Sequence, residues 1–243
     1  MGFEALYVAV HTSTVYFFGA VGLANARNLE MFVIQLVIMV GFSLLLYSWL
    51  LTGRNNMHAM LLIGVVIGGG LGSLSTFMQR MLTPSEFDVL TARLFGSVNN
   101  ADPAYFPVAI PLALAAALLV YMHSRTLNVV ALGREPAINL GVNHRAHAIY
   151  VLVLVSVLMA VSTALVGPMT FLGFLVATLA YQCADTYDHR YIFPMAVLIG
   201  FVVLASAYFV MNHIYYAQGI VSIIIELVGG TVFLVMILRK GTL

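Results

Sequence analysis

The chain has 243 residues, of which 62% are hydrophobic and only 8% are charged, and its formal net charge is +1. A soluble domain has about a quarter charged residues, so this composition excludes an ordinary soluble protein and places the chain in a lipid bilayer. The near-zero net charge gives no support for nucleic-acid binding.

The sequence contains apolar segments that predict membrane-spanning helices. Most are close to the 20 or so residues that a helix needs to cross a bilayer core, and none alternates as a barrel strand does. Because lipid cannot satisfy an open backbone, each span must be helical. We therefore predict an all-α polytopic membrane helix bundle of about eight transmembrane helices, forming a single domain over residues 1–243. The eight segments are 5–23, 31–52, 58–81, 104–123, 147–167, 169–184, 194–213 and 219–238.

The ten basic residues give this bundle an orientation. With eight spans both termini lie on one side, and seven basic residues share that side: Arg54, Arg125, Arg134, Arg145, Arg190, Arg239 and Lys240. The other side has Arg27, Arg80 and Arg93. Because cytoplasmic loops are enriched in Lys and Arg, we expect both termini in the cytoplasm.

Two connections are long enough to have structure of their own. The outer one, 82–103, combines proline, paired asparagines and mixed charge, which predicts a short surface helix plus a turn. The inner one, 124–146, is amphipathic and contains glycines, which predicts two short helical pieces. Pro136 suits the first turn of a helix, and Gly133 and Gly141 suit helix ends. Such a pair either fits a groove on a partner or rests on lipid, and the residues alone leave both open.

The sequence gives no reason to expect catalysis, a bound cofactor or a metal. A nucleotide-binding P-loop needs a lysine after a glycine-rich turn, and the one lysine, Lys240, lies in the C-terminal tail. Asp185, Asp188 and His189 lie close in sequence, but adjacent residues on a helix diverge, so we expect Asp188 to cap the following helix instead of binding metal.

Four stretches together resemble one family of membrane proteins. They are LNVVALGREPAINLGV at 127–142, VGPMTFLGF at 166–174, Asp188-His189-Arg190 followed by Pro194, and the final helix from Gln218-Gly219 through Gly229-Gly230 to Phe233. Their order and spacing resemble the FecCD family of permeases for iron siderophores and vitamin B12. That family has a ten-helix permease fold, so the eight spans correspond to its helices three to ten, and its first two helices are missing from this sequence.

The resemblance implies a transmembrane subunit of an ABC importer, with 127–142 as the cytoplasmic segment that couples it to ATPase subunits. The coupling residues are Ala131, Leu132, Gly133, Arg134, Glu135, Pro136, Ala137, Leu140 and Gly141. Two permease chains, identical or related, would form the pathway. An extracytoplasmic binding protein would deliver the substrate, and the partner ATPases would use the ATP.

The expected cargo is a ferric siderophore, of the catecholate type. Another metal chelate or vitamin B12 remains an alternative. An ion-coupled secondary transporter is a further alternative, although it needs coupling groups near the midplane and only Glu226 qualifies. An intramembrane enzyme would need paired catalytic groups within the spans, and none is visible in the sequence.

A few other residues are candidates outside the coupling segment. Glu226 lies within the last span, where a lipid-facing carboxylate costs about 2.5–3.5 kcal/mol. It therefore lines a pathway, meets a partner subunit, bonds to a neighbouring helix or is a protonated acid. Gly167 and Pro168 are candidates for the pathway or an interface. Arg27 and Arg93 lie on the outer side, where they either dock the binding protein or act as interface anchors.

Overall fold

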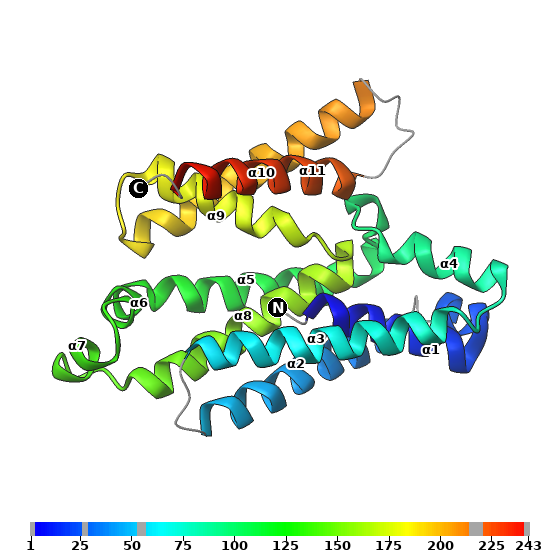
Figure 1. Ribbon diagram of the computed structural model, residues 1–243, viewed down its shortest axis with the longest axis horizontal. Helices are drawn as coiled ribbons and strands as arrows, with labels where there is room; N and C mark the ends of the chain where they lie inside the picture. Colours follow the sequence, from blue (N-terminus) through cyan, green and yellow to red (C-terminus); the bar gives the residue numbers. More distant parts are fainter. Residues whose placement is uncertain (1–2, 26–28, 53–56, 214–220, 241–243) are drawn as a thin grey trace. The chain divides into compact units, whose positions relative to one another are not determined.

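The structure is a computed structural model that describes residues 3–25, 29–52, 57–213 and 221–240. In these ranges the chain is helical and contains no strand, as predicted (Figure 1). The α-helices are α1 (Phe3–Asn25), α2 (Leu29–Thr52), α3 (Met57–Gln79), α4 (Pro84–Leu94), α5 (Phe106–Met122), α6 (Ser124–Ala131), α7 (Arg134–Asn139), α8 (His144–Val166), α9 (Thr170–Ala184), α10 (His189–His213) and α11 (Val221–Lys240). Two 3-10 turns, Val98–Asn100 and Pro103–Tyr105, precede α5.

Each of the eight predicted apolar segments coincides with one helix: α1, α2, α3, α5, α8, α9, α10 and α11. Within the described residues, three segments are long and apolar enough to cross a membrane: Pro103–Met122, His144–Val166 and His189–His213. The number of membrane crossings therefore stays a prediction. α9 has 15 residues, or about 22 Å of helix, and is shorter than the bilayer core, as expected for the segment after Gly167-Pro168.

Helix α10 begins five residues before the predicted segment, at His189 instead of Pro194. Asp188 causes the earlier start, because its carboxylate accepts a hydrogen bond from the backbone N–H of Arg190 at 3.0 Å. The predicted helix cap at Asp188 is therefore confirmed, and Pro194 lies inside the helix.

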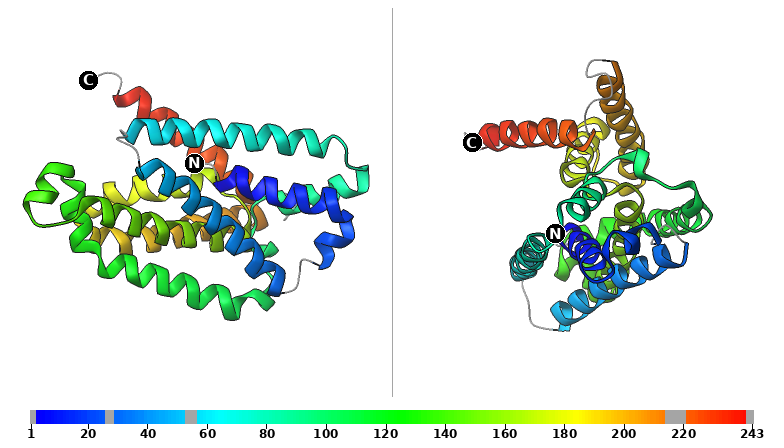
Figure 2. Two further views of the ribbon diagram at one scale, coloured as in Figure 1. Left: turned by 90° about the horizontal axis from the view of Figure 1, so that it is seen from below. Right: turned by 90° about the vertical axis from the view of Figure 1, so that its right-hand side faces the viewer.

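The chain divides into two compact units. The first, Met1–Val120 with Ala137–Pro168, contains α1 to α4, most of α5, and α8. In it α1 packs along α3 and α2 packs along α8, an arrangement that can be followed in Figure 2. Their core includes the rings of Phe32 and Tyr105, which stack with centroids 4.6 Å apart.

The second unit, Tyr121–Pro136 with Met169–Leu243, contains α6, α9, α10 and α11. Helix α9 packs against both α10 and α11, and α6 packs against α10. Gly229 permits the close approach of α11 to α9, because a Cβ there would lie 2.7 Å from the Cβ of Phe171. Its core is formed by Ala207, Met211, Val221 and Ile225.

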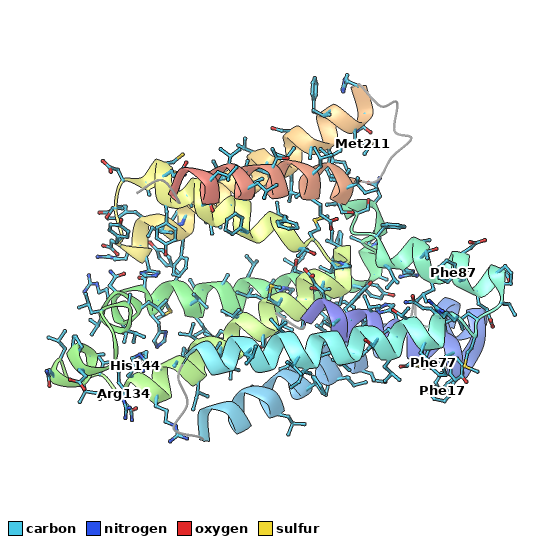
Figure 3. All side chains as sticks on the ribbon, viewed as in Figure 1. Phe17, Phe77, Phe87, Arg134, His144 and Met211 are labelled. Atoms are coloured by element: carbon cyan, nitrogen blue, oxygen red, sulfur yellow. The ribbon has the colours of Figure 1, made fainter. Side chains whose placement is uncertain are left out.

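Large apolar side chains cover much of the surface of the described helices. Phe17 and Phe77 of the first unit are exposed, as are Val197 and Phe201 of the second. Figure 3 shows the side chains that project from the described helices and labels Phe17 and Phe77 among them. A soluble monomer rarely exposes large contiguous apolar patches, so this surface supports a lipid environment.

Candidate functional site: the coupling segment and its attachment

The inner connection forms the two short helices that its glycines predict. Helix α6 ends where Gly133 adopts a φ of +105°, a conformation that favours glycine. Helix α7 ends at Gly141, whose φ is +78°. The N–H of Gly141 donates to the carbonyl of Ile138, and the N–H of Val142 donates to the carbonyl of Ala137, both at 2.9 Å. This pair of bonds is a Schellman motif with Gly141 at its left-handed position.

Most of the predicted coupling residues are exposed. Leu132 and Leu140 expose 63% and 62% of their side chains, and Arg134, which Figure 3 labels, is exposed with Glu135 and Pro136. Ala137 is the exception, because it is fully buried. Apolar side chains exposed at the tip of a helix pair are typical of a surface that a partner covers.

The side chain of Asn128, on α6, forms a polar attachment that the sequence analysis did not identify. Its amide nitrogen donates to Oδ1 of Asp188 at 2.8 Å, and its carbonyl oxygen accepts the backbone N–H of His189 at 3.0 Å. The same oxygen bonds to Nδ1 of the His189 ring. A backbone N–H can only donate, so the amide orientation is fixed, and the ring nitrogen that faces the carbonyl must carry a proton.

These bonds also affect the acidity of Asp188. The pKa of its carboxyl lies below the usual range, first because the N–H of Arg190 donates to it and second because the Asn128 amide does. Asp188 is therefore a carboxylate at neutral pH, which is the form that can accept both bonds.

A hollow of about 670 Å³ lies beside this attachment, within the second unit. Asn128 and Leu132 of α6 form one wall, and Thr186, Tyr187 and Asp188 of the turn between α9 and α10 form the other. Tyr187 exposes 87% of its side chain at this turn. The turn therefore presents an exposed aromatic ring next to the exposed end of α6.

Gly167 is required by the backbone and by packing. Its φ of +85° follows the last turn of α8, and a Cβ there would lie 3.1 Å from Cα of Gly96. The neighbouring carbonyl of Val166 accepts the N–H of Ser97 at 2.8 Å. Gly167 thus lets the 82–103 connection lie against the end of α8. Pro168 follows it in the break before α9, and a role for either residue in a pathway stays a prediction.

Glu226 lies on the exposed side of α11, between the exposed Ile223 and Leu227. Among the described residues its carboxylate has no recorded hydrogen bond or ion pair. The described part of the chain therefore gives no support to the interpretation that Glu226 bonds to a neighbouring helix of the same chain. Contact with a pathway or a partner subunit stays a prediction.

Arg27 and Arg93 are the two arginines that the sequence predicts on the outer side. Arg93 lies in the last turn of α4, where its charge complements the helix dipole, and its backbone carbonyl accepts the hydroxyl of Tyr7 at 3.2 Å. Arg27 lies outside the described residues. Docking of a binding protein at either residue is untested.

Helix α3 has a polar face that sequence reasoning also missed. A hollow of about 560 Å³ is lined by residues at helical spacing, Gly69, Gly72, Ser73, Thr76, Phe77 and Arg80. The signal was present in the sequence, because steps of three and four residues place small and polar side chains on one face of a helix.

Comparison with known proteins identifies the family. The FecCD transport family matches residues 1–239. The petrobactin import permease FatC of Bacillus anthracis is 58% identical over the whole of this chain and 69% of its own length. The petrobactin permease YclO of Bacillus subtilis is 34% identical over 99% of this chain and 77% of its own. The ferric enterobactin permease FepG of Escherichia coli is 28% identical over 81% of this chain and 60% of its own.

A solved structure supports the fold. An inward-facing ABC transporter of the metal-chelate type superposes with a TM-score of 0.83, covering 98% of this chain and 75% of that one at 19% identity. With the family match over nearly all residues and two relatives above 30% identity, the chain belongs to the FecCD transport family.

Proposed function

We propose that this chain is the transmembrane permease subunit of an ABC importer that carries ferric petrobactin across the bacterial inner membrane. The observation that carries the proposal is the similarity to FatC, which is 58% identical over the whole of this chain and 69% of its own length. A second relative named for petrobactin, YclO, shares 34%. Relatives named for enterobactin or hemin share 26% to 29%. The alternatives of vitamin B12 and of an ion-coupled transporter gain no support from these relatives.

The second permease of this importer is a related chain and not a second copy. Bacillus anthracis has a further petrobactin permease, FatD. The alignment with FatD covers 74% of this chain, and its sequence identity is 26%. Two different permeases named for one substrate in one organism favour a heterodimer. Glu226 on the exposed side of α11 is then a candidate for the contact between the two permeases, since a carboxylate is costly in lipid.

The energy comes from separate ATPase subunits that dock on the coupling segment, residues 127–142. The exposed Leu132 and Leu140 and the charged pair Arg134 and Glu135 form the contact. Both termini and this segment face the cytoplasm, and the 82–103 connection faces the binding protein. No cofactor is bound by this chain.

Uptake of radiolabelled iron tests the substrate. The chain would be expressed with its partner permease, ATPase and binding protein in a strain without siderophore permeases. We expect uptake of ferric petrobactin and at least about tenfold less uptake of ferric enterobactin or hemin. A tenfold ratio corresponds to a free-energy difference of about 1.4 kcal/mol. Equal uptake of all three would overturn the petrobactin assignment, and no uptake of any would overturn the importer.

Cysteine labelling tests the orientation. Cys183 is exposed, so a Cys183→Ala background would carry one new cysteine, at Ile138 or at Ser85 of α4. In intact cells a membrane-impermeant maleimide should label position 85, and position 138 should react only after permeabilisation. Labelling of position 138 from outside would place the coupling segment on the wrong side and contradict ATPase docking there.

A further inference from the structure

We propose that Asn128 is a positioning residue that fastens α6 to the first turn of α10, so that a displacement of the coupling segment moves α10. Asn128, Asp188 and His189 are called the Asn128 latch below. The inference rests on the proposed function, because it needs an ATPase that displaces the coupling segment.

The latch joins two distant parts of the chain through one side chain. Asn128 bonds to residues 60 and 61 positions further along the sequence, and it uses both its donor and its acceptor to do so. Helix α6 otherwise follows α5 directly and packs on α10. A displacement of α6 must therefore either carry the start of α10 with it or break the bonds of Asn128.

The two partners of Asn128 are themselves held in place. Asp188 accepts the N–H of Arg190 at 3.0 Å, and its own N–H donates to the hydroxyl oxygen of Thr186 at 3.2 Å. The ring of His189 lies 5.5 Å, between centroids, from the ring of Phe193 one turn along α10. Asn128 thus binds the capped start of a helix and not a loose loop.

Helix α10 is long enough to carry the displacement across the membrane. Its 25 residues span about 37 Å, more than the hydrocarbon core of a bilayer. It packs along α9 and α11 within the same unit. A movement at His189 therefore reaches the interior of the second unit along one continuous helix, although Pro194 removes one of its hydrogen bonds.

An asparagine suits this position because its two partners need opposite groups. The N–H of His189 needs an acceptor, and the carboxylate of Asp188 needs a donor. Leucine at 128 would leave the N–H of His189 without a partner and would leave the carboxylate of Asp188 with the N–H of Arg190 alone. Aspartate would keep the acceptor but place a carboxylate against the carboxylate of Asp188, which is repulsive.

Hydrogen exchange in the assembled wild-type importer tests whether the latch exists. The first N–H groups of a helix have no partner within the helix, so protection of the His189 amide must come from Asn128. We expect this amide to exchange at least about tenfold more slowly than a free amide, and Asn128→Leu to remove the protection. Exchange of the wild-type amide at the free rate would overturn the latch, whatever the substrate proves to be.

The ratio of ATP hydrolysed to iron imported tests whether the latch transmits movement. In proteoliposomes with ferric petrobactin, we expect Asn128→Asp to raise this ratio by about fivefold while the ATPase still co-purifies, within the range of coupling effects that single residues have. Adding Asp188→Asn should lower the ratio again, because its amide can donate to the new carboxylate. A purely structural role would reduce the amount of importer and leave the ratio unchanged.

Gln182→Glu is the matched control, because it makes the same change of an amide to a carboxylate at an exposed residue of α9 outside the latch and should leave the ratio unchanged. A wild-type ratio in Asn128→Asp would refute the transmission role. If the wild-type importer moves no ferric petrobactin, the proposed substrate fails, yet the exchange of the His189 amide still decides whether the latch forms.

Discussion

The two long connections of this chain are both short helices joined by turns, yet they are attached in opposite ways. In the 82–103 connection, Leu90 of α4 is fully buried against Val15 of α1, and Ser97 bonds to the end of α8. In the coupling segment, Leu132 and Leu140 are mostly exposed. A buried leucine thus anchors the first connection, whereas the leucines of the second remain uncovered.

This contrast separates a connection that packs against its own unit from one whose leucines stay uncovered within the described part of the chain. Burial of a leucine contributes about 1.5–3 kcal/mol to folding, which the 82–103 connection gains from α1. Leu132 and Leu140 of the coupling segment are exposed and do not contribute this free energy. Hydrogen bonds of Asn128 hold α6 in place instead. The same substitution placed in both connections should therefore have different consequences.

The largest effect on stability is expected for Leu90→Ala. It leaves a cavity at a fully buried position and should lower the free energy of unfolding by about 2–5 kcal/mol. Thermal unfolding of the purified protein in detergent would measure the loss. An unchanged midpoint would show that α4 does not pack on α1 as described.

A somewhat smaller loss is expected for Gly167→Ala. The positive φ of Gly167 strains any other residue by about 1–3 kcal/mol, and the added Cβ would press on the backbone of Gly96. Gly141→Ala is the comparison, because its φ is also positive but nothing lies within 4 Å of the new Cβ. Equal losses at both sites would mean that the contact with Gly96 contributes nothing.

Leu132→Ala should change stability by no more than about 0.5 kcal/mol, because the side chain is exposed. In return, it should reduce the amount of ATPase that co-purifies by several fold. A pull-down with tagged ATPase, beside Leu90→Ala for contrast, gives the measurement. Normal ATPase recovery would contradict the assignment of Leu132 to the docking surface.

The smallest effect is expected for Thr83→Ala at the start of α4. The hydroxyl and then the backbone N–H of Thr83 donate to Glu86 and hold the pKa of its carboxyl below the ordinary value. A lowered pKa stabilises the fold above the ordinary pKa of Glu, and this contribution disappears as the pH falls through the lowered value. Thr83→Ala should raise the pKa of Glu86 toward normal, which carbon NMR of labelled carboxyls would detect. An unchanged pKa would contradict the hydroxyl bond.

The sequence predicted the helices and most of the coupling segment for simple reasons. Long apolar runs must form helices in lipid, because only a helix satisfies its own backbone there. Gly133 and Gly141 were expected at helix ends, and their positive φ confirms this. The predicted segment began at residue 194, five residues after the start of α10, although Asp188 was already expected to be a cap.

The Asn128 latch could not be predicted, because it joins residues 60 positions apart. An asparagine on the surface of a short helix gives no indication in the sequence of a distant partner. The polar face of α3 was predictable in principle from the spacing of Ser73, Thr76 and Arg80. Which surface the ATPase, the binding protein or a second permease covers depends on chains that this sequence does not contain.

The shortness of α9 has a consequence for the surrounding lipid. A helix of 15 residues covers about 22 Å of a hydrocarbon core that is about 30 Å thick. The break at Gly167-Pro168 and the polar turn from Asp185 to Asp188 lie at the two ends of α9 and would occupy the remaining thickness of that core. If α9 crosses the bilayer as predicted, the bilayer thins beside it or water reaches inward to those residues, and the thickness of the host membrane then affects how freely this part of the chain moves.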